Sequence, residues 1–196
     1  MAKVSLQNAA GSHRHAALPQ YERSHADLYL TPAEAVERLY RARPHLKETR
    51  VWDSSAGLGH IVKACFDAGG WCIGTELHEH DHDTVMPVAV GIDLLSLSAP
   101  YEKTCIVNPP YNQAAQHIRH MLGLGCTVHA ILRFNFVTAK NRAGLLPHLR
   151  EILMVGRTRM LPPGVPDKGM QPSIDYAWFT FTPERKDGHA VIFERA

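Results

Sequence analysis

Thr104-Cys105-Ile106-Val107-Asn108-Pro109-Pro110-Tyr111 is the most informative stretch of this 196-residue chain. Its first four residues predict a buried strand, and Pro109 ends that strand because a residue that precedes proline is disfavoured in the helical region. Two successive prolines remove two backbone N–H groups and stiffen the turn. The side-chain oxygen of Asn108 and a nearby backbone carbonyl can then act as acceptors, and Tyr111 offers a flat ring for stacking. The turn therefore predicts a site for a planar NH2 group on a conjugated system, such as adenine N6, cytosine N4 or a glutamine amide.

Upstream, the segment 51–60 predicts a strand, a turn of small residues with two glycines, and the start of a helix. Glycines in such a turn allow the backbone to approach a ligand closely. The segment 71–76 predicts a second strand that ends in Glu76. This acid follows Asp53 by about 20 residues, the spacing at which a Rossmann-type unit places its ribose-binding carboxylate.

A third strand is predicted over 88–92, directly before Asp93, and the fourth ends at Asn108. Each of four successive strands is thus followed by, or ends in, a polar side chain that could bind a ligand or take part in a reaction. The carboxyl ends of parallel strands form one edge of a sheet, where ligands bind in open α/β folds. The sequence therefore predicts a ligand crevice at this edge.

With these motifs, the chain resembles the class I S-adenosylmethionine-dependent methyltransferases that modify amino groups. It is most similar to the DNA N6-adenine methyltransferases with the gamma-type motif order, over residues 27 to 182. The resemblance implies an α/β, Rossmann-like fold with a seven-stranded, mostly parallel sheet and helices on both faces. It also implies S-adenosyl-L-methionine as the cofactor. Ser54-Ser55 departs from the family, in which a Pro-x pair commonly follows the motif acid, and no separate target-recognition domain is visible.

The resemblance also assigns roles to residues. The catalytic motif would be Asn108, Pro109, Pro110 and Tyr111. Glu76 would hold the ribose hydroxyls and Asp93 would lie near the cofactor adenine. The full set of expected cofactor-binding residues is Tyr29, Thr31, Pro32, Asp53, Ser54, Ser55, Ala56, Gly57, Gly59, Glu76, Leu77, Asp93, Leu94 and Asn108.

The reaction implied is methyl transfer to the exocyclic N6 amine of adenine in DNA. The same motif also serves RNA adenine and guanine amino methyltransferases, cytosine N4 enzymes, which more often carry Ser at the position of Asn108, and protein glutamine methyltransferases. The last group usually has an N-terminal helical substrate domain, and the short tail at that place in this sequence disfavours it. A methyltransferase fold kept as a non-catalytic binding module is an alternative of another class. A Rossmann dehydrogenase is disfavoured because the turn lacks the three-glycine spacing.

Charge is unevenly distributed although the net charge is only +2. Residues 51–100 sum to −6 and residues 101–160 to +6. The basic part follows the catalytic motif, where a nucleic-acid substrate would run, and DNA is favoured over RNA. The candidate phosphate-binding residues are Arg133, Lys140, Arg142, Arg157, Arg159 and Lys168, with Arg119 and Arg150 as further candidates.

Length and composition predict one globular domain over 25–196, preceded by a flexible arm over 1–24. No apolar run is long enough for a membrane span, and the N-terminus lacks the apolar core of a signal peptide. The four cysteines match neither a zinc site nor a disulfide framework, which favours reduced thiols and a cytoplasmic location. His78-Glu79-His80-Asp81-His82-Asp83 could bind a transition metal, but the proposed chemistry needs none, so no metal site is predicted.

Further elements follow from periodicity. A helix should begin with Thr31 as N-cap and Pro32 at its first position, with Ala35, Val36, Leu39 and Tyr40 on one face. A second helix should follow Gly59, with Ile61, Val62, Ala64 and Cys65 at helical spacing, and a third should follow Asn112. A helix is also expected over 142–150, and strands over 126–136, 152–155, 177–181 and 189–193. The Pro- and Gly-rich segment 160–173 is too long for an ordinary connection. By the resemblance, it would cover the substrate or read its flank.

Overall fold

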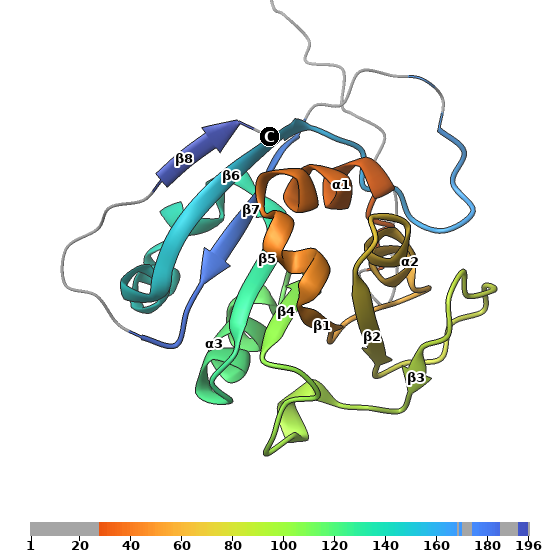
Figure 1. The fold of residues 1–196 in the computed structure, drawn as a ribbon, viewed down its shortest axis with the longest axis horizontal. Coiled ribbons are helices and arrows are strands. Elements are labelled where there is room, and N and C mark those ends of the chain that lie inside the picture. The colour runs from red at the N-terminus through yellow and green to blue at the C-terminus, as the bar shows by residue number, and fades with distance from the viewer. Residues whose placement is uncertain (1–27, 168, 170–173, 185–191, 196) are drawn as a thin grey trace, which may run out of the picture.

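The computed structural model describes residues 28–167, 169, 174–184 and 192–195, the last four by their backbone alone. The chain forms one sheet with the strand order β3-β2-β1-β4-β5-β7-β6-β8 (Figure 1). The strands are β1 Arg50–Asp53, β2 Trp71–Glu76, β3 Ala89–Val90, β4 Thr104–Val107, β5 Thr127–Arg133, β6 Leu149–Arg157, β7 Asp175–Phe181 and β8 Ile192–Arg195. The expected arm over 1–24 lies outside the described residues.

Every strand pairing in this sheet is parallel except those of β7, which runs antiparallel to both β5 and β6. The predicted α/β class with a mostly parallel sheet is therefore confirmed. The strand count differs from the expected seven, because β8 pairs alongside β6 and adds an eighth strand at the outer edge.

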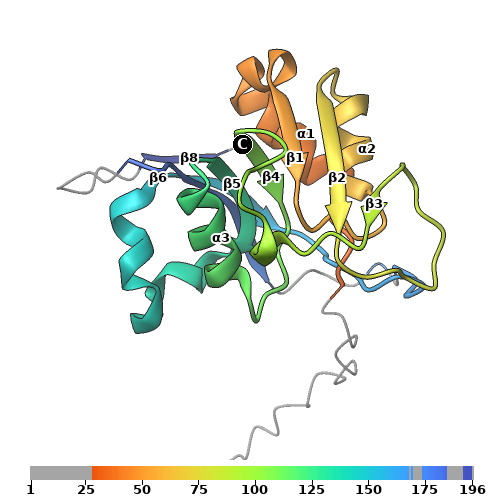
Figure 2. The same ribbon diagram turned by 90° about the horizontal axis from the view of Figure 1, so that it is seen from below.

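Helices cover both faces of the sheet, as predicted (Figure 2). The helices α1 Ala33–Ala42 and α2 His60–Asp67 pack on one face, whereas α3 Ala114–Gly123 packs on the other. Alternation along the strands explains the two layers, since successive side chains point to opposite faces. Val51, Ile106 and Trp178 belong to the first apolar core, and their chain neighbours Trp52, Val107 and Phe179 belong to the second.

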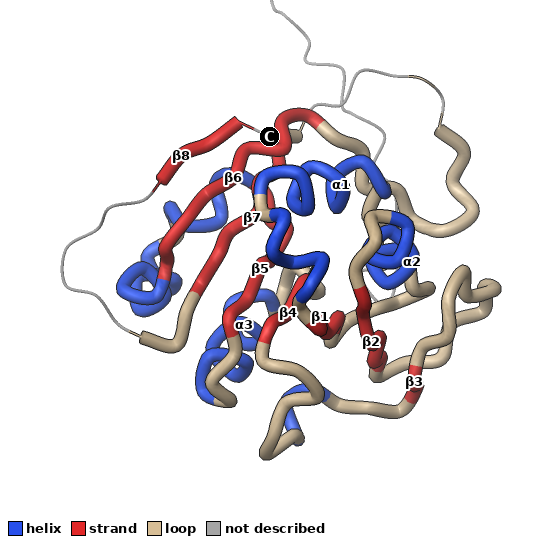
Figure 3. The backbone as a smooth tube through the Cα atoms, viewed as in Figure 1, coloured by secondary structure: helices blue, strands red, loops and turns tan. Residues whose placement is uncertain are grey.

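Short 3₁₀ segments, coloured with the helices in Figure 3, occur at four places among the described residues, and the last two replace elements that were expected to be longer or α-helical. They are η1 Pro44–Glu48, η2 Leu94–Ser96, η3 Phe134–Thr138 and η4 Lys140–His148. The expected helix over 142–150 is η4, which contains Pro147, and proline cannot donate within a regular helix. The strand expected to reach Phe136 ends at Arg133, where η3 begins, and the third strand shrinks to Ala89–Val90.

The start of α1 is shifted by one residue from the prediction. Pro32 is the N-cap, with extended backbone angles, and Thr31 is buried and makes no cap hydrogen bond. The shift in the helix start follows from the preceding segment. Leu30 donates its N–H to the carbonyl of Leu161 at 2.8 Å, and this bond holds the segment extended. The predicted apolar face of this helix is correct, since Ala35, Val36, Leu39 and Tyr40 are all buried.

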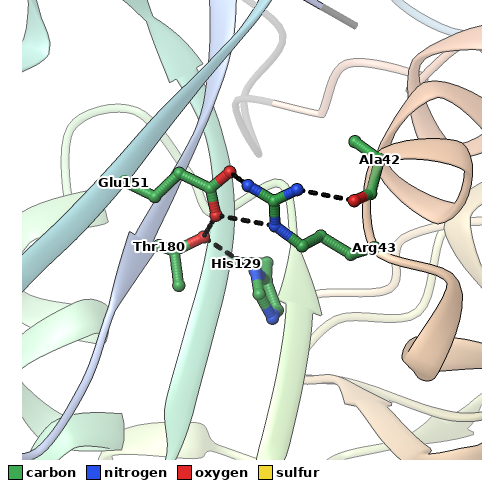
Figure 4. Close-up of polar contacts among 5 residues, drawn as sticks. All are labelled: Ala42, Arg43, His129, Glu151 and Thr180. Carbon is green, nitrogen blue, oxygen red and sulfur yellow. Dashed lines mark hydrogen bonds and ion pairs between the residues drawn. The ribbon is translucent and has the colours of Figure 1, made fainter. Parts of the chain in front are cut away.

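A buried ionic network ties the end of α1 to the sheet (Figure 4). Arg43 donates from Nε to Glu151 at 3.1 Å, forms a second bond from Nη2 to the same carboxylate, and also donates to the carbonyl of Ala42. The hydroxyl of Thr180 donates to Glu151 at 3.3 Å and lies 2.9 Å from Nδ1 of His129. Burial lowers the pKa of His129 to about 4, and the neighbouring His45 and Arg43 act in the same direction. The imidazole is therefore neutral at physiological pH.

Candidate active site

Two cavities flank the turn that follows β4, at the carboxyl edge of the sheet. The first, of about 590 Å³, is lined by the ends of β1 and β2, by η2 and by the start of α3. The second, of about 410 Å³, is lined by Tyr111, Arg133, Phe136 and Arg142 among others. Asn108 and Pro110 line the first cavity, Tyr111 lines the second, and Asn112 lines both. The predicted catalytic turn thus stands between two spaces of ligand size.

Asn108 holds its amide in one orientation. Its Nδ2 donates to the backbone carbonyl of Tyr29 at 3.0 Å. Its Oδ1 is buried and has no hydrogen-bond partner among the described residues. Buried polar atoms are nearly always paired, so an orphaned acceptor at a cavity wall points to a donor supplied from outside the chain.

The two prolines differ in the part that their carbonyl groups play in the turn. The carbonyl of Pro110 accepts from the N–H of Gln113 at 2.9 Å, which closes the turn that leads into α3. The carbonyl of Pro109 takes no part in that turn. It is the backbone acceptor next to Asn108 in the sequence.

Tyr111 lies in a cluster of aromatic and cationic side chains. Its ring centroid is 5.4 Å from that of Tyr29 and 6.4 Å from that of Tyr176. Its hydroxyl donates to the hydroxyl of Tyr176 at 3.3 Å. The guanidinium carbon of Arg133 lies over the ring, 5.3 Å from the centroid. The second cavity therefore has an aromatic wall with a positive charge beside it.

The glycine turn after β1 is held by the acid at the end of β2. Gly57 and Gly59 both have positive φ angles, of 51° and 85°. Glu76 accepts from the N–H of Gly57 through Oε2 at 2.8 Å, and from the N–H groups of Leu77 and His78 through Oε1 at 2.8 and 3.2 Å. Three backbone donors thus fix this carboxylate at the wall of the first cavity, which Glu76 lines.

Asp53 is almost wholly buried, with 1% of its surface exposed. Oδ1 accepts from the N–H of Ser55 at 3.2 Å, and Oδ2 has no partner among the described residues. Burial raises the pKa of this carboxyl to about 8; the Ser55 hydrogen bond works against the shift and the charge of Glu76 works with it. A cation brought close to Asp53 would favour its ionised form.

The remaining expected cofactor residues lie around the same edge. Asp93 accepts from the N–H of Leu95 at 2.9 Å and caps η2. Ser54, Ser55, Leu77, Asp93 and Leu94 line the first cavity. Tyr29, Thr31, Asp53 and Ala56 line a third space of about 30 Å³ beneath the segment 28–31. Pro32, Gly57 and Gly59 line none of these three cavities and shape the backbone around them.

The expected nucleic-acid residues divide into two groups. Arg133 and Arg142 line the second cavity, and Lys140 is exposed on the same η3–η4 segment. Arg157 is instead paired with Asp175 and Arg159 with Asp167, and neither lines the second cavity. Lys168 lies outside the described residues. Of the two further candidates, Arg119 donates to the carbonyl of Asn141 and Arg150 to those of Pro147 and Leu149.

Several residues near the site were not found from the sequence. His117 of α3 lines the first cavity between Ser55, 3.4 Å away, and Gln113, 3.3 Å away. Burial lowers its pKa, although nearby Asp93 and Glu76 oppose the shift. Spacing from the motif could have suggested Gln113 and His117, since both follow it within two helical turns. Tyr176 had no such signal, because it reaches Tyr111 from a strand distant in sequence.

The described part of the chain has no group of three or more His, Cys, Asp or Glu side chains placed to hold a metal ion. Two members of the 78–83 run, His78 and His80, line the first cavity instead. No helix among the described residues has the length and apolar character needed to span a bilayer.

No family model and no curated protein matches this sequence. Solved structures do share its fold. A putative RNA methyltransferase from Pyrococcus horikoshii superposes with a TM-score of 0.56 at 16% identity, over 80% of this chain and 87% of that one. A SAM-dependent O-methyltransferase from Thermotoga maritima gives 0.52 at 13% identity, over 81% and 68% of the two chains.

A third similar structure is the methyltransferase subunit of a type I restriction-modification system from Streptococcus thermophilus. Its TM-score is 0.55 at 12% identity, over 85% of this chain and 47% of that subunit. The present chain thus spans about half the length of such subunits. At these identities the similarity concerns the fold. The chain has the Rossmann-like α/β fold seen in the class I S-adenosylmethionine-dependent methyltransferases.

Proposed function

We propose that this chain transfers a methyl group from S-adenosyl-L-methionine to the exocyclic N6 amine of adenine in DNA. One observation carries the proposal: Oδ1 of Asn108 is a buried acceptor without a partner among the described residues, at a turn that stands between two cavities. An amine donor that enters from the second cavity would satisfy it, and the cofactor would occupy the first.

The residues of the first cavity fit this cofactor. The acids Glu76 and Asp93 can accept from hydroxyl and amino groups, while Leu77 and Leu94 offer apolar surface to a flat base. A cationic ligand beside the unpartnered oxygen of Asp53 would favour the ionised form of this carboxyl and would be stabilised by its charge. When bound, S-adenosylmethionine supplies an electrophilic methyl group on a sulfonium centre.

The chain's own residues would activate the amine. The lone pair of an adenine amine is delocalised into the ring, so the amine is a poor nucleophile. Asn108 Oδ1 and the carbonyl of Pro109 would each accept a hydrogen bond from one of the two N–H groups of the amine. These bonds favour a more tetrahedral nitrogen, whose lone pair is then available to attack the methyl group. Because these acceptors are preorganised, catalysis would come from positioning and charge stabilisation. No strong base is required, since the methylated ammonium is itself acidic.

The second cavity would hold the base. Tyr111 would stack on it, and a base in a duplex would have to leave the helix to reach this site. Arg133 and Arg142 at the cavity, with Lys140 close by in sequence, would contact phosphates. The resemblance of the motif to DNA N6-adenine enzymes supports DNA as the substrate.

RNA adenine is the second candidate. The fold is shared with the Pyrococcus protein, whose description names RNA as its substrate. The same basic residues would contact either polymer. The two functions therefore have to be separated by experiment.

The test is methyl transfer from labelled S-adenosylmethionine to unmethylated DNA, total RNA and a protein extract in parallel reactions, followed by nucleoside mass spectrometry. The proposal predicts N6-methyladenine in DNA. Label in RNA alone would replace DNA by RNA as the substrate. Label in protein alone, or in none of the three despite measurable cofactor binding, would refute a nucleic-acid substrate.

A further inference from the structure

Phe134 is an exposed aromatic residue beside the second cavity. It begins η3, and 41% of its surface is accessible to solvent. Its chain neighbours on both sides, Arg133 and Asn135, line the cavity, whereas Phe134 does not. Phe134 is therefore adjacent in the chain to two residues of the cavity wall. Single exposed apolar residues are common on proteins, so exposure alone does not indicate a role for this ring.

The backbone beneath Phe134 is firmly anchored. Phe136, two residues on, is buried, with its ring 6.1 Å from that of Phe179. Arg142 lies over the ring of Phe136 at 4.1 Å and donates to its carbonyl at 2.6 Å. The hydroxyl of Thr138 donates to the carbonyl of Asn135 at 2.8 Å. The short helix thus presents Phe134 to solvent from a fixed base, and the ring does not pack into either apolar core.

The surroundings of Phe134 are positively charged. Arg133 and Lys140 are exposed, and Arg142 is partly buried beside them in sequence. The sequence between Cys126 and Arg150 contains no Asp or Glu. An exposed aromatic ring in a basic segment that contains no acid matches the chemistry of single-stranded nucleic acid, which combines base faces with phosphates.

We propose that Phe134 stacks on the nucleobase that neighbours the target base in a bound polynucleotide strand, while Arg133 and Lys140 contact its phosphates. The inference rests on the proposed function and deepens it, because it requires a polymer of bases as the substrate. A free nucleoside or a protein amide would leave the ring in water. Stacking on a base is tolerant of sequence, so the contact would add affinity without selecting a target sequence.

Two variants test this inference, each with a matched control. Phe134→Ala removes the ring, and Phe66→Ala removes a ring of similar exposure, 39%, from α2, which lines neither large cavity. Fluorescence anisotropy with a short fluorescein-labelled, adenine-containing single-stranded oligonucleotide measures binding. Phe134→Ala should bind about tenfold more weakly than the wild type and should raise the KM for DNA without changing affinity for S-adenosylmethionine. Phe66→Ala should match the wild type in its affinity for the oligonucleotide, its KM for DNA and its affinity for S-adenosylmethionine.

Two tryptophan variants, Phe134→Trp and its control Phe66→Trp, give a fluorescence readout that does not depend on methyltransferase activity. Emission of Phe134→Trp should be quenched by the oligonucleotide but not by heparin, a polyanion without bases. Phe66→Trp should respond to neither. Equal oligonucleotide affinity of Phe134→Ala and the wild type, or equal quenching by heparin, would overturn the inference. If the wild type transfers methyl groups only to protein, the proposed function fails, while the oligonucleotide measurements still decide the role of Phe134.

Discussion

The orientation of a single amide group determines what the Asn108 site can do. Because Nδ2 is tied to the carbonyl of Tyr29, the oxygen must point the other way, where no described residue meets it. Tyr29 was expected to bind the cofactor. The structure shows that its main chain orients the candidate catalytic residue, a role that no pattern of side chains in the sequence could reveal.

Tyr176 is expected to position the ring of Tyr111. The two hydroxyls are 3.3 Å apart, and Tyr176 is 3% exposed. Tyr176→Phe keeps the ring but removes the hydroxyl partner of Tyr111, so we expect a KM for DNA roughly three- to tenfold higher, corresponding to one lost neutral hydrogen bond. Affinity for S-adenosylmethionine should not change.

Steady-state kinetics at saturating cofactor, together with calorimetry for cofactor binding, would check this prediction. Tyr111→Phe should have the same effect, and the double variant should be no worse than either single one, because the two hydroxyls act as a pair. Additive losses would show that the two residues act independently.

At the scale of elements, the turn between β1 and α2 depends on a glycine that the sequence could identify but not explain. Gly59 has a φ of 85°, and a Cβ there would lie 3.0 Å from the carbonyl oxygen of Met86. The residue thus needs both a left-handed backbone and space against another segment of main chain. Gly69 has nearly the same φ, 84°, but nothing lies within 4 Å of its added Cβ.

These two glycines form a matched pair. Gly69→Ala should lower the free energy of unfolding by about 1–2 kcal/mol, the strain of a left-handed alanine, with little change in cofactor affinity. Gly59→Ala carries the same strain and must also move the turn away from Met86, so S-adenosylmethionine should bind at least about tenfold more weakly. Urea titration and calorimetry measure the two quantities. Equal cofactor affinities would show that the close approach at Gly59 has no role in the site.

Elements with strong periodicity could be predicted, and those held by tertiary contacts could not. The apolar faces of α1 and α2 were correct because burial on one side of a helix produces a regular pattern. The α-helix expected over 142–150 was wrong, because the residues of η4 show no clear amphipathic period and Pro147 interrupts the pattern. The exact start of α1 was also missed, because the pairing of Leu30 with Leu161 is a contact between distant residues.

At the scale of the whole molecule, the Arg43–Glu151 network joins the end of α1 to β6 and lines neither large cavity. Glu151→Ala would leave a largely buried guanidinium without this carboxylate. We expect the free energy of unfolding to fall by about 3 kcal/mol, the lower part of the range for broken buried pairs, because Arg43 keeps 22% side-chain exposure. Cofactor affinity of the folded protein should be unchanged.

The control is the exposed pair of Glu34 and Arg38 on α1. Glu34→Ala should cost less than about 0.5 kcal/mol, as is usual for exposed pairs one turn apart. Chemical unfolding of both variants at one pH gives the comparison. Equal losses would mean that the buried network adds nothing beyond a surface contact.

Stability should also depend on pH through Asp53. Its pKa is about 8 in the folded protein and 3.8 for an ordinary aspartate, so the folded state binds the proton more tightly. Its contribution to stability is therefore greatest below about pH 4 and is lost as the pH rises through about 8. Melting temperatures of the wild type and Asp53→Asn across this range isolate the effect. The wild type should lose stability relative to the variant as pH rises, and a constant difference would contradict the raised pKa.

The general plan of the molecule followed from its motifs, because acids and the Asn-Pro-Pro-Tyr turn at successive strand ends must meet at one edge of a parallel sheet. Asp53, Glu76 and Asn108 do so. The sequence could not show which of the basic residues lie at a cavity and which are paired with acids, because that depends on contacts between distant residues. Arg157 and Arg159 are paired with acids, whereas Arg133 and Arg142 line the cavity.

The role of Asn108 is tested most directly by a comparison of the wild type with Asn108→Ala. Both would be given labelled S-adenosylmethionine and unmethylated DNA, and the products would be identified by nucleoside mass spectrometry, with cofactor affinity measured in parallel. We predict N6-methyladenine from the wild type, a loss of at least about a hundredfold in the variant, and nearly equal cofactor affinities. Comparable N6-methyladenine from both proteins would show that the buried oxygen of Asn108 is not the acceptor for the target amine.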